Sequence, residues 1–291
     1  MDENPGMEQS TAAVLDRVSK ALGADAQDVT ELDGGQVGSV YRVSFNDQQD
    51  VAVKVDDSPL GIEAGMLQYL DRETRLPVPA VLHIEQDLLV LPFIRGDEQF
   101  DERAERDLAR HVAALHDISA PAFGFPFDTL SGPYSQSNPW TDSWVEFFRE
   151  RRLLPFARAA RDEGSLPETE FDRVRTLADT LDERLVEPDS PSLLHGDIHP
   201  GNVIVSDGTV QAVLDPAIYF GHDEVDLAYL ELSESISDAF YDEYRRHRDI
   251  SDSYFAERRD VYTAFHALEN VRFFGDDVGP RLDRALDRLG L

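Results

Sequence analysis

The chain has 291 residues, enough for one large domain or for two lobes that each bury a core. Its net charge of −31 argues against binding to nucleic acid or to an anionic membrane, while 41% hydrophobic residues exclude a disordered chain and the lack of cysteine excludes disulfides and thiolate metal sites. No apolar run could cross a bilayer, and residues 1–10 lack the apolar segment of a signal peptide, so we expect a cytoplasmic protein.

The first third of the chain predicts a helix, three strands, a second helix and two further strands. Residues 1–9 are expected to form a flexible tail, and 10–24 an amphipathic helix that begins at Ser10-Thr11. The β-branched runs that follow are separated by Gly-Gly and by Asn46-Asp47, a hairpin signature. We expect strands at 29–33, 39–45 and 50–56, a helix at 61–73 and two strands within 79–94.

Most of the remaining sequence is predicted to be helical. The exceptions are a β pair that turns at Asp207-Gly208 and a stretch at 118–139, rich in Pro, Gly, Phe and Ser, which is long enough to suggest a function. The expected helices are 98–117, 140–161, 167–186, 223–247, 251–272 and 279–290. The fold class is therefore α+β, with a small β-rich N-lobe over 10–94, a large helical C-lobe over 95–291 and a ligand cleft between them.

The charge has an unusual composition. Acidic residues outnumber basic ones 58 to 27, and Lys20 and Lys54 are the only lysines, so the other 25 basic residues are arginine. Self-repulsion of this size destabilises a compact state, and it weakens at about 1 M salt, where the Debye length is roughly 3 Å. We expect a protein from a salt-accumulating halophile. The alternative is an acidic surface for binding another protein, but the acids are spread along the whole chain.

Lys54 lies inside the apolar run "VAVKV" of a chain that otherwise almost lacks lysine. Burying an ammonium group is costly unless it is paired, and Glu63 in the following helix is the nearest plausible partner. An edge-strand lysine that reaches back to water is the plainer alternative. "VAVK" nevertheless matches the kinase motif whose lysine holds the α- and β-phosphates. The preceding turn with Gly34 and Gly35 could bring backbone N–H groups to phosphates.

The stretch "LLHGDIHPGNVIV" (193–205) contains the spacing expected of a phosphoryl-transfer loop. Asp197 and Asn202 are five residues apart, like the catalytic Asp and the magnesium-binding Asn of kinases. Asp215 follows on the far arm of the β pair, where a second magnesium ligand is expected. The pattern predicts a base, two metal ligands and a phosphate-holding lysine.

A different interpretation of the same stretch is a metal site. On a strand, His195, Asp197 and His199 would share one face and leave a fourth ligand position open. However, Gly196 weakens a strand and Pro200-Gly201 ends it. This alternative also leaves Lys54 unexplained.

Together these residues resemble the kinase-like small-molecule phosphotransferases, and among them the fructosamine kinase (ketosamine-3-kinase) family. The segments "LDPAIYFGHDEVDLAYLEL" (214–232) and "FGFPFDTLSGPYSQSNPWTDSWVEFFRERRL" (123–153) are the specific matches, and "FHALENVRFFG" is similar to the closing helix of that family. The resemblance covers the chain from about residue 10 to its end. It implies a protein-kinase-like two-lobe fold with a nucleotide-binding N-lobe. The implied activity is ATP-dependent phosphorylation of the 3-hydroxyl of a ketosamine, which removes the sugar and repairs the amine.

The resemblance also implies roles for individual residues. Asp197 would be the base, Lys54 with Glu63 would hold the phosphates of ATP, and Asp226 would brace the catalytic loop. His195 would support that loop structurally. The Mg²⁺ ligands would be Asn202 and Asp215. In the connector "LVLPFIRG", the backbone C=O of Pro92 and N–H of Ile94 would bind adenine; only a carbonyl is needed at Pro92, where the family usually has Glu.

The substrate side departs from the family pattern at His199, where the family typically has Trp. "HGDIHPGN" is similar here to aminoglycoside and choline phosphotransferases, which makes such an acceptor the alternative to a ketosamine or glycated amine. Asn138, Trp140 and Trp144 are the other candidate substrate contacts, against helix-start and core-packing roles. His116 and His222 are expected to be ordinary structural or surface histidines. A kinase-like module that binds nucleotide without turnover is a third possibility, which the intact motif residues disfavour.

Overall fold

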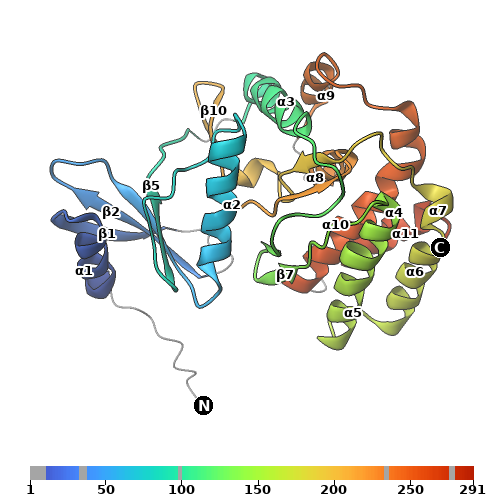
Figure 1. Ribbon diagram of the computed structural model, residues 1–291, viewed down its shortest axis with the longest axis horizontal. Helices are drawn as coiled ribbons and strands as arrows, with labels where there is room; N and C mark the ends of the chain where they lie inside the picture. Colours follow the sequence, from blue (N-terminus) through green and yellow to red (C-terminus); the bar gives the residue numbers. More distant parts are fainter. Residues whose placement is uncertain (1–10, 33–37, 98–99, 233–235, 275–278) are drawn as a thin grey trace.

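The computed structural model describes residues 11–32, 38–97, 100–232, 236–274 and 279–291. The first lobe consists of α1 (Thr11–Leu22), β1 (Ala26–Leu32), β2 (Ser39–Phe45), β3 (Val51–Val55), α2 (Leu60–Glu73), β4 (His83–Ile84) and β5 (Leu88–Pro92). Its five strands form one antiparallel sheet in the order β1-β2-β3-β5-β4. In Figure 1 this lobe is on the left, and the helical lobe is on the right.

Strand β3 shows how the sheet separates its two faces. Val51 and Val53 point to one side and pack with Val14 and Val18 of α1, because side chains of a strand alternate between faces. Lys54 has the opposite orientation. On that opposite side Leu60, Ala64 and Leu67 of α2 cover Leu89 of β5. The alternation therefore directs the lysine toward α2 and the space between the lobes.

The second lobe is mostly helical, with three two-stranded sheets inserted. Its helices are α3 (Glu102–His116), α4 (Trp144–Phe147), α5 (Leu154–Asp162), α6 (Glu168–Asp179), α7 (Leu181–Arg184), α8 (Glu224–Leu232), α9 (Asp238–Tyr244), α10 (Arg259–Phe274) and α11 (Gly279–Arg288). Its strands pair as β6 (Thr129–Ser131) with β7 (Tyr134–Gln136), β8 (Ser192–Leu194) with β11 (Tyr219–Gly221), and β9 (Val203–Ser206) with β10 (Thr209–Val213). The α+β two-lobe prediction is confirmed.

Helix α2 belongs to both lobes. While Leu60, Ala64 and Leu67 pack on the sheet, Met66 and Leu70 belong to the large hydrophobic core of the second lobe. Figure 1 shows α2 standing between the sheet and the helices. The helix that carries Glu63 is therefore fixed from two sides.

Several helix boundaries differ from the predictions. The helix expected over 140–161 is divided into α4, a π-helical turn at Phe148–Leu153 and α5, and the one expected over 223–247 is divided into α8 and α9. The irregular stretch 118–139 contains the β6–β7 hairpin. Helix α3 begins where Asp101 caps it, since its carboxylate accepts from the N–H groups of Arg103 and Ala104. The predicted boundary at 94 and 95 falls between β5 and α3, and the predicted tail over 1–9 lies outside the described residues.

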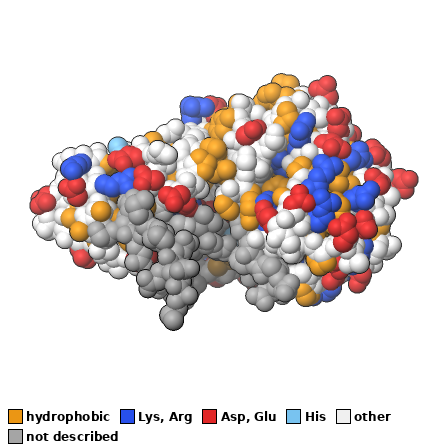
Figure 2. All heavy atoms as spheres, turned by 90° about the horizontal axis from the view of Figure 1, so that it is seen from below, with side chains coloured by type: hydrophobic (Ala, Val, Ile, Leu, Met, Phe, Trp, Pro, Cys, Tyr) orange, Lys and Arg blue, Asp and Glu red, His pale blue; other side chains and the backbone are white. Residues whose placement is uncertain are grey.

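On the face drawn in Figure 2, acidic side chains are spread over both lobes, and arginines gather over the helical lobe. In the helical lobe, Arg173 of α6 pairs with Asp283 of α11, and Arg272 of α10 pairs with Glu163, the residue after α5. Within the described residues, no helix combines the length and the hydropathy needed to cross a membrane.

Candidate active site

The lysine of β3 meets two carboxylates at the lobe boundary. Lys54 Nζ lies 2.7 Å from Glu63 Oε2 on α2 and 3.4 Å from Asp215 Oδ1, which follows β10. Burial by itself would lower the pKa of Lys54, but the two carboxylates outweigh this effect and the pKa is raised. The ammonium group therefore stays charged in a half-buried position, as a phosphate-binding lysine must.

Asp197 and Asn202 form the second part of the site. The side-chain Nδ2 of Asn202 donates to both the backbone O (2.9 Å) and the Oδ2 (3.0 Å) of Asp197. Burial raises the pKa of Asp197 to about 8, although hydrogen bonds from Tyr229 and Asn202 oppose the shift. A carboxylate with its pKa near neutrality is suited to accept a proton.

The turn before Asp197 is shaped by Gly196. This residue has φ +81°, and a Cβ at its position would lie 2.3 Å from the carbonyl O of Ala217, so only glycine fits. Its N–H donates to Asp226 Oδ1 (2.9 Å), and the N–H of His195 donates to Asp226 Oδ2 (2.8 Å). Both oxygens of one buried carboxylate thus hold the backbone that presents Asp197.

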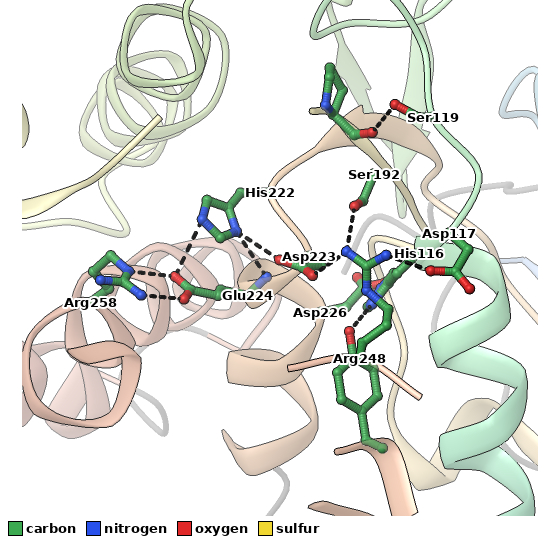
Figure 3. Close-up of polar contacts among 12 residues, drawn as sticks. His116, Asp117, Ser119, Ser192, His222, Asp223, Glu224, Asp226, Arg248 and Arg258 are labelled. Carbon is green, nitrogen blue, oxygen red and sulfur yellow. Dashed lines mark hydrogen bonds and ion pairs between the residues drawn. The ribbon is translucent and has the colours of Figure 1, made fainter. Parts of the chain in front are cut away.

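A network of buried polar residues surrounds Asp226 (Figure 3). His116 Nε2 lies 3.1 Å from Asp226 Oδ2, and His116 Nδ1 lies 2.8 Å from the Tyr244 hydroxyl. Burial would raise the pKa of Asp226, but His116 and the backbone donor of His195 hold it below its usual value. His116 is thus part of the support of the loop, a more specific role than the structural or surface position expected for it from the sequence.

The figure also shows a chain of charges next to this network. Arg258 pairs with Glu224, and Arg248 joins Asp223 on α8's N-terminal side to Asp117 after α3. His222 lies between Glu224 and Asp223. These pairs connect α3, α8 and the segment after α9.

His195 is fully buried, and burial lowers its pKa to about 4, so the ring is neutral near pH 7. Its Nδ1 accepts weakly from the N–H of Asp197 (3.4 Å). His199 caps the short turn at Pro200–Asn202 by accepting from Gly201 N–H (3.1 Å). Within the described residues, no group of three or more His, Cys, Asp or Glu side chains is arranged to bind a metal ion. The three-ligand metal site of His195, Asp197 and His199 is therefore not formed.

Asn202 and Asp215 present the oxygens that Mg²⁺ prefers. Because Nδ2 of Asn202 is used by Asp197, its Oδ1 is left as the acceptor. The side chain of Asp215 is 52% exposed, and its backbone has φ +50°. Magnesium is usually bound by one or two protein oxygens together with waters and phosphates, so this donor pair fits it.

The connector after β5 continues the pairing with β3 by one residue. Phe93 N–H donates to the carbonyl of Asp50, at the end of the β3–β5 ladder. Neighbouring residues of a strand direct their polar groups to opposite edges, so Pro92 and Ile94 direct theirs away from β3. Gly34 and Gly35 lie outside the described residues.

Two of the expected substrate contacts are instead buried in the core. Trp144 is 0% exposed, and its Nε1 donates to the Tyr262 hydroxyl (2.9 Å). Asn138 is 2% exposed and spends its amide on Thr129 Oγ1 and Phe127 O, while Arg152 donates to its Oδ1. Substrate cannot reach side chains enclosed in this way, so we correct both predictions to packing roles. Trp140, by contrast, is 49% exposed and lies beside Phe220.

Three polar residues on the side of Asp197 that faces α8 and α10 were not predicted from the sequence. They are Tyr229 of α8 and two residues of α10, His266 and Glu269. The quoted segments 214–232 and 265–275 contain all three, but nothing in their spacing indicated that α10 would pack against α8 beside the catalytic loop.

Solved structures place the fold among the kinase-like phosphotransferases. An aminoglycoside phosphotransferase in complex with ADP and hygromycin B superposes with a TM-score of 0.67 at 16% identity over 95% of this chain and 98% of that one. A candidate fructosamine-3-kinase from Thermobifida fusca superposes with a TM-score of 0.84 at 30% identity, over 95% of this chain and 98% of that one. The two-lobe arrangement with this loop between the lobes thus defines the class as kinase-like phosphotransferase.

Sequence comparison identifies the family. A model of the fructosamine kinase family matches residues 7–290, and the chain belongs to that family. A probable ketoamine kinase from Synechocystis sp. is 36% identical over 269 residues, 90% of this chain and 86% of that one. The chloroplastic protein-ribulosamine 3-kinase of Arabidopsis thaliana is 30% identical over 224 residues, 74% of this chain and 66% of that one.

Proposed function

We propose that this chain is an ATP-dependent kinase that phosphorylates the 3-hydroxyl of a ketosamine of the fructosamine or ribulosamine type. The main support is the contact of Lys54 with two carboxylates, Glu63 and Asp215, at the boundary of the two lobes. The hydrogen-bonded pair of Asp197 and Asn202 lies beside this cluster. Membership of the fructosamine kinase family and the similarity to a ribulosamine 3-kinase support this acceptor class.

In the proposed reaction, Asp197 accepts the proton of the acceptor hydroxyl as its oxygen attacks the γ-phosphorus of ATP. A new bond joins that oxygen to phosphorus, the bond to the β,γ-bridging oxygen breaks, and ADP leaves. Burial raises the pKa of Asp197 to about 8, which brings it close to neutral pH, where a general base works best. Asn202 contributes by fixing the orientation of the carboxylate.

The phosphates require positive charge from the protein and from a metal. Lys54, held by Glu63, would contact the α- and β-phosphates. Asn202 and Asp215 would bind Mg²⁺, which supplies charge that offsets the charge of the phosphates. Gly34 and Gly35 would add backbone N–H groups, and the Pro92 carbonyl and Ile94 N–H would bind adenine at the connector.

The acceptor would lie next to Asp197, between His199 and the exposed face of Trp140. A small-molecule ketosamine or another glycated amine is the proposed partner. Phosphorylation at O3 makes the sugar leave, so the proposed physiological result is repair of the amine.

The experiment measures ADP release by the full chain in high salt, with ATP and Mg²⁺, in the presence of a fructosamine or a ribulosamine. The unlinked sugar and amine serve as control acceptors. We expect release only with the ketosamine, and ³¹P–¹H coupling to the proton on C3 of the product. Asp197→Asn should lower kcat about 10²–10⁴-fold. If no ketosamine stimulates release, the proposal is wrong.

The alternative acceptor is an aminoglycoside- or choline-type alcohol. His199 supports it, since this residue lies two positions after the base, where the family resemblance leads us to expect Trp. The same assay with an aminoglycoside and with choline distinguishes the two. Tight ATP binding without release to any acceptor would instead indicate a non-catalytic nucleotide-binding module.

A further inference from the structure

A hollow of about 140 Å³ lies in the helical lobe between the end of α8, the first half of α10 and α11. Four arginines line it, Arg259, Arg281, Arg284 and Arg288, together with Thr263. The described residues that form its wall include none to which the proposed reaction gives a role. Four arginines at one hollow are unexpected in a chain with 58 acidic and 27 basic residues, so we call it the arginine hollow.

Helix α11 separates its charges by face. Arg281, Arg284 and Arg288 are spaced i, i+3, i+7, which places them along one side of the helix. The two aspartates of the helix, Asp283 and Asp287, instead pair with an arginine of α6. Like charges one turn apart on a helix repel each other. The arginine side of α11 is therefore unfavourable by itself, and a bound anion would offset the repulsion.

Two of the four arginines have a carboxylate partner. Arg259 Nη1 lies 3.0 Å from Glu231 Oε1, which belongs to the end of α8 and also lines the hollow. Arg288 Nη1 lies 3.2 Å from Asp260 Oδ1 on α10. Each pair is neutral overall. These arginines therefore add hydrogen-bond donors to the wall but little net charge.

Arg281 and Arg284 carry the charge that is not offset. Within the part of the chain that the structure describes, neither guanidinium group makes a hydrogen bond or an ion pair. Arg281 is half-buried, and Arg284 is exposed. A guanidinium group presents its N–H donors in a fork that fits two oxygens of a phosphate. A phosphate monoester carries a charge of about −1.5 to −2 near pH 7, which matches two arginines.

The size of the arginine hollow favours a small anion over a peptide. A water molecule needs roughly 10–15 Å³ of such space, so about 140 Å³ holds a phosphate group and several waters. We propose that the arginine hollow binds a phosphate dianion, either inorganic phosphate or the phosphate of a small monoester, with Arg281 and Arg284 as its charged contacts. This site is separate from the one proposed for ATP, and the inference does not depend on the proposed function.

Calorimetric titration of the full chain with inorganic phosphate and with glycerol 3-phosphate tests the proposal. MgADP is present to fill the candidate active site, and about 1 M KCl reduces the Debye length to roughly 3 Å, so that only direct contacts give binding. We expect one phosphate per chain. In Arg281→Gln/Arg284→Gln the affinity should fall at least about tenfold, because charge-assisted hydrogen bonds are lost. Tighter binding of glycerol 3-phosphate would identify a monoester as the ligand, and tighter binding of phosphate would identify the free ion.

Arg75→Gln/Arg158→Gln is the matched control, since it removes two exposed arginines elsewhere, and its affinity should stay within about twofold of wild type. No binding by the wild type, or equal binding by the variant of the hollow, overturns the inference. A wild-type crystal structure with phosphate in which no anion lies within about 3.5 Å of Arg281 or Arg284 also overturns it, whether or not the variant folds. So does a dimer that this variant dissociates without any phosphate binding, because the arginines would then join two chains.

Discussion

His116 and Asp226 are both wholly buried, and the imidazole Nε2 lies 3.1 Å from the carboxylate Oδ2. The same carboxylate also accepts two backbone N–H groups of the catalytic loop. In Asp226→Asn, one of the two accepting oxygens becomes an NH₂ group, which would face a backbone N–H donor of His195 or Gly196 and could not accept from it. We expect a loss of roughly 3–5 kcal/mol in the free energy of unfolding, together with a lower kcat.

Denaturant unfolding followed by circular dichroism measures that loss. Asp117→Asn is the control, because this aspartate is exposed and pairs with Arg248 at the surface of the same network. An equal effect of both substitutions would contradict the special position of Asp226.

Lys54 can be tested against the only other lysine of the chain. Lys54→Met removes the charge proposed to hold the phosphates, and we expect kcat/KM for ATP to fall about 10²–10³-fold. Lys20→Met removes an equal charge from the surface of α1, where Lys20 pairs with Asp16. Steady-state kinetics should show no effect of this second change. Similar kinetics for both variants would rule out a phosphate role for Lys54.

The two tryptophans should respond in opposite ways. Trp144→Ala opens a cavity in the core and is expected to cost about 3–5 kcal/mol of stability. Trp140→Ala, at a side chain that is 49% exposed, should leave Tm nearly unchanged and raise the KM for the acceptor. Thermal melts and acceptor titrations of both variants provide the measurement. If Trp144→Ala raised the KM for the acceptor with Tm unchanged, and Trp140→Ala left that KM unchanged, the roles assigned to the two tryptophans would be reversed.

Acid should destabilise the protein through Asp223. Burial would raise the pKa of Asp223, but hydrogen bonds from His222 and Arg248 hold it far below its usual value. The unfolded chain therefore binds the proton more readily than the folded chain. The contribution to stability is complete above the unfolded pKa of about 4 and is lost as the pH falls below it.

The free energy of unfolding, measured between about pH 6 and pH 3, shows whether stability falls as the pH is lowered. Asp223→Asn should flatten the loss on the acid side, whereas Asp249→Asn, at an exposed position, should leave the slope unchanged. A steeper slope in Asp223→Asn would contradict the linkage.

Salt should stabilise a chain of net charge −31. At about 1 M KCl the Debye length is roughly 3 Å, so repulsion among exposed carboxylates is screened while buried pairs such as Arg258 with Glu224 persist. We expect Tm to rise steadily between about 0.1 M and 3 M KCl, and an uncharged osmolyte to have a smaller effect. Equal Tm values at both salt concentrations would argue against a halophilic origin.

The contacts expected from sequence are present in the structure where they depend on local spacing, while the roles of these residues stay predictions. Asp197 and Asn202 are five residues apart in one turn, and Lys54 and Glu63 are nine residues apart on a strand and the next helix, so their pairing follows from short-range geometry. The antiparallel sheet followed from alternating strands and turn residues.

The substrate side was harder to predict because it depends on which way a helix faces. Trp144 and Trp140 differ by four residues, yet Ser143 caps α4 and turns Trp144 into the core while Trp140 stays outside the helix. Tyr229 and His266 are 37 positions apart in the chain and stack on each other, a contact created only when α8 and α10 pack. No local pattern in the sequence contains that information.

The double attachment of α2 has a consequence for cooperativity. Since Met66 and Leu70 are packed in one lobe, and Leu60 and Leu67 in the other, neither lobe can lose its structure without exposing apolar surface of the helix that carries Glu63. Partial unfolding of either lobe would release the partner of Lys54. We therefore expect nucleotide affinity to report on the integrity of the entire chain, and heat to abolish nucleotide binding and secondary structure in a single transition.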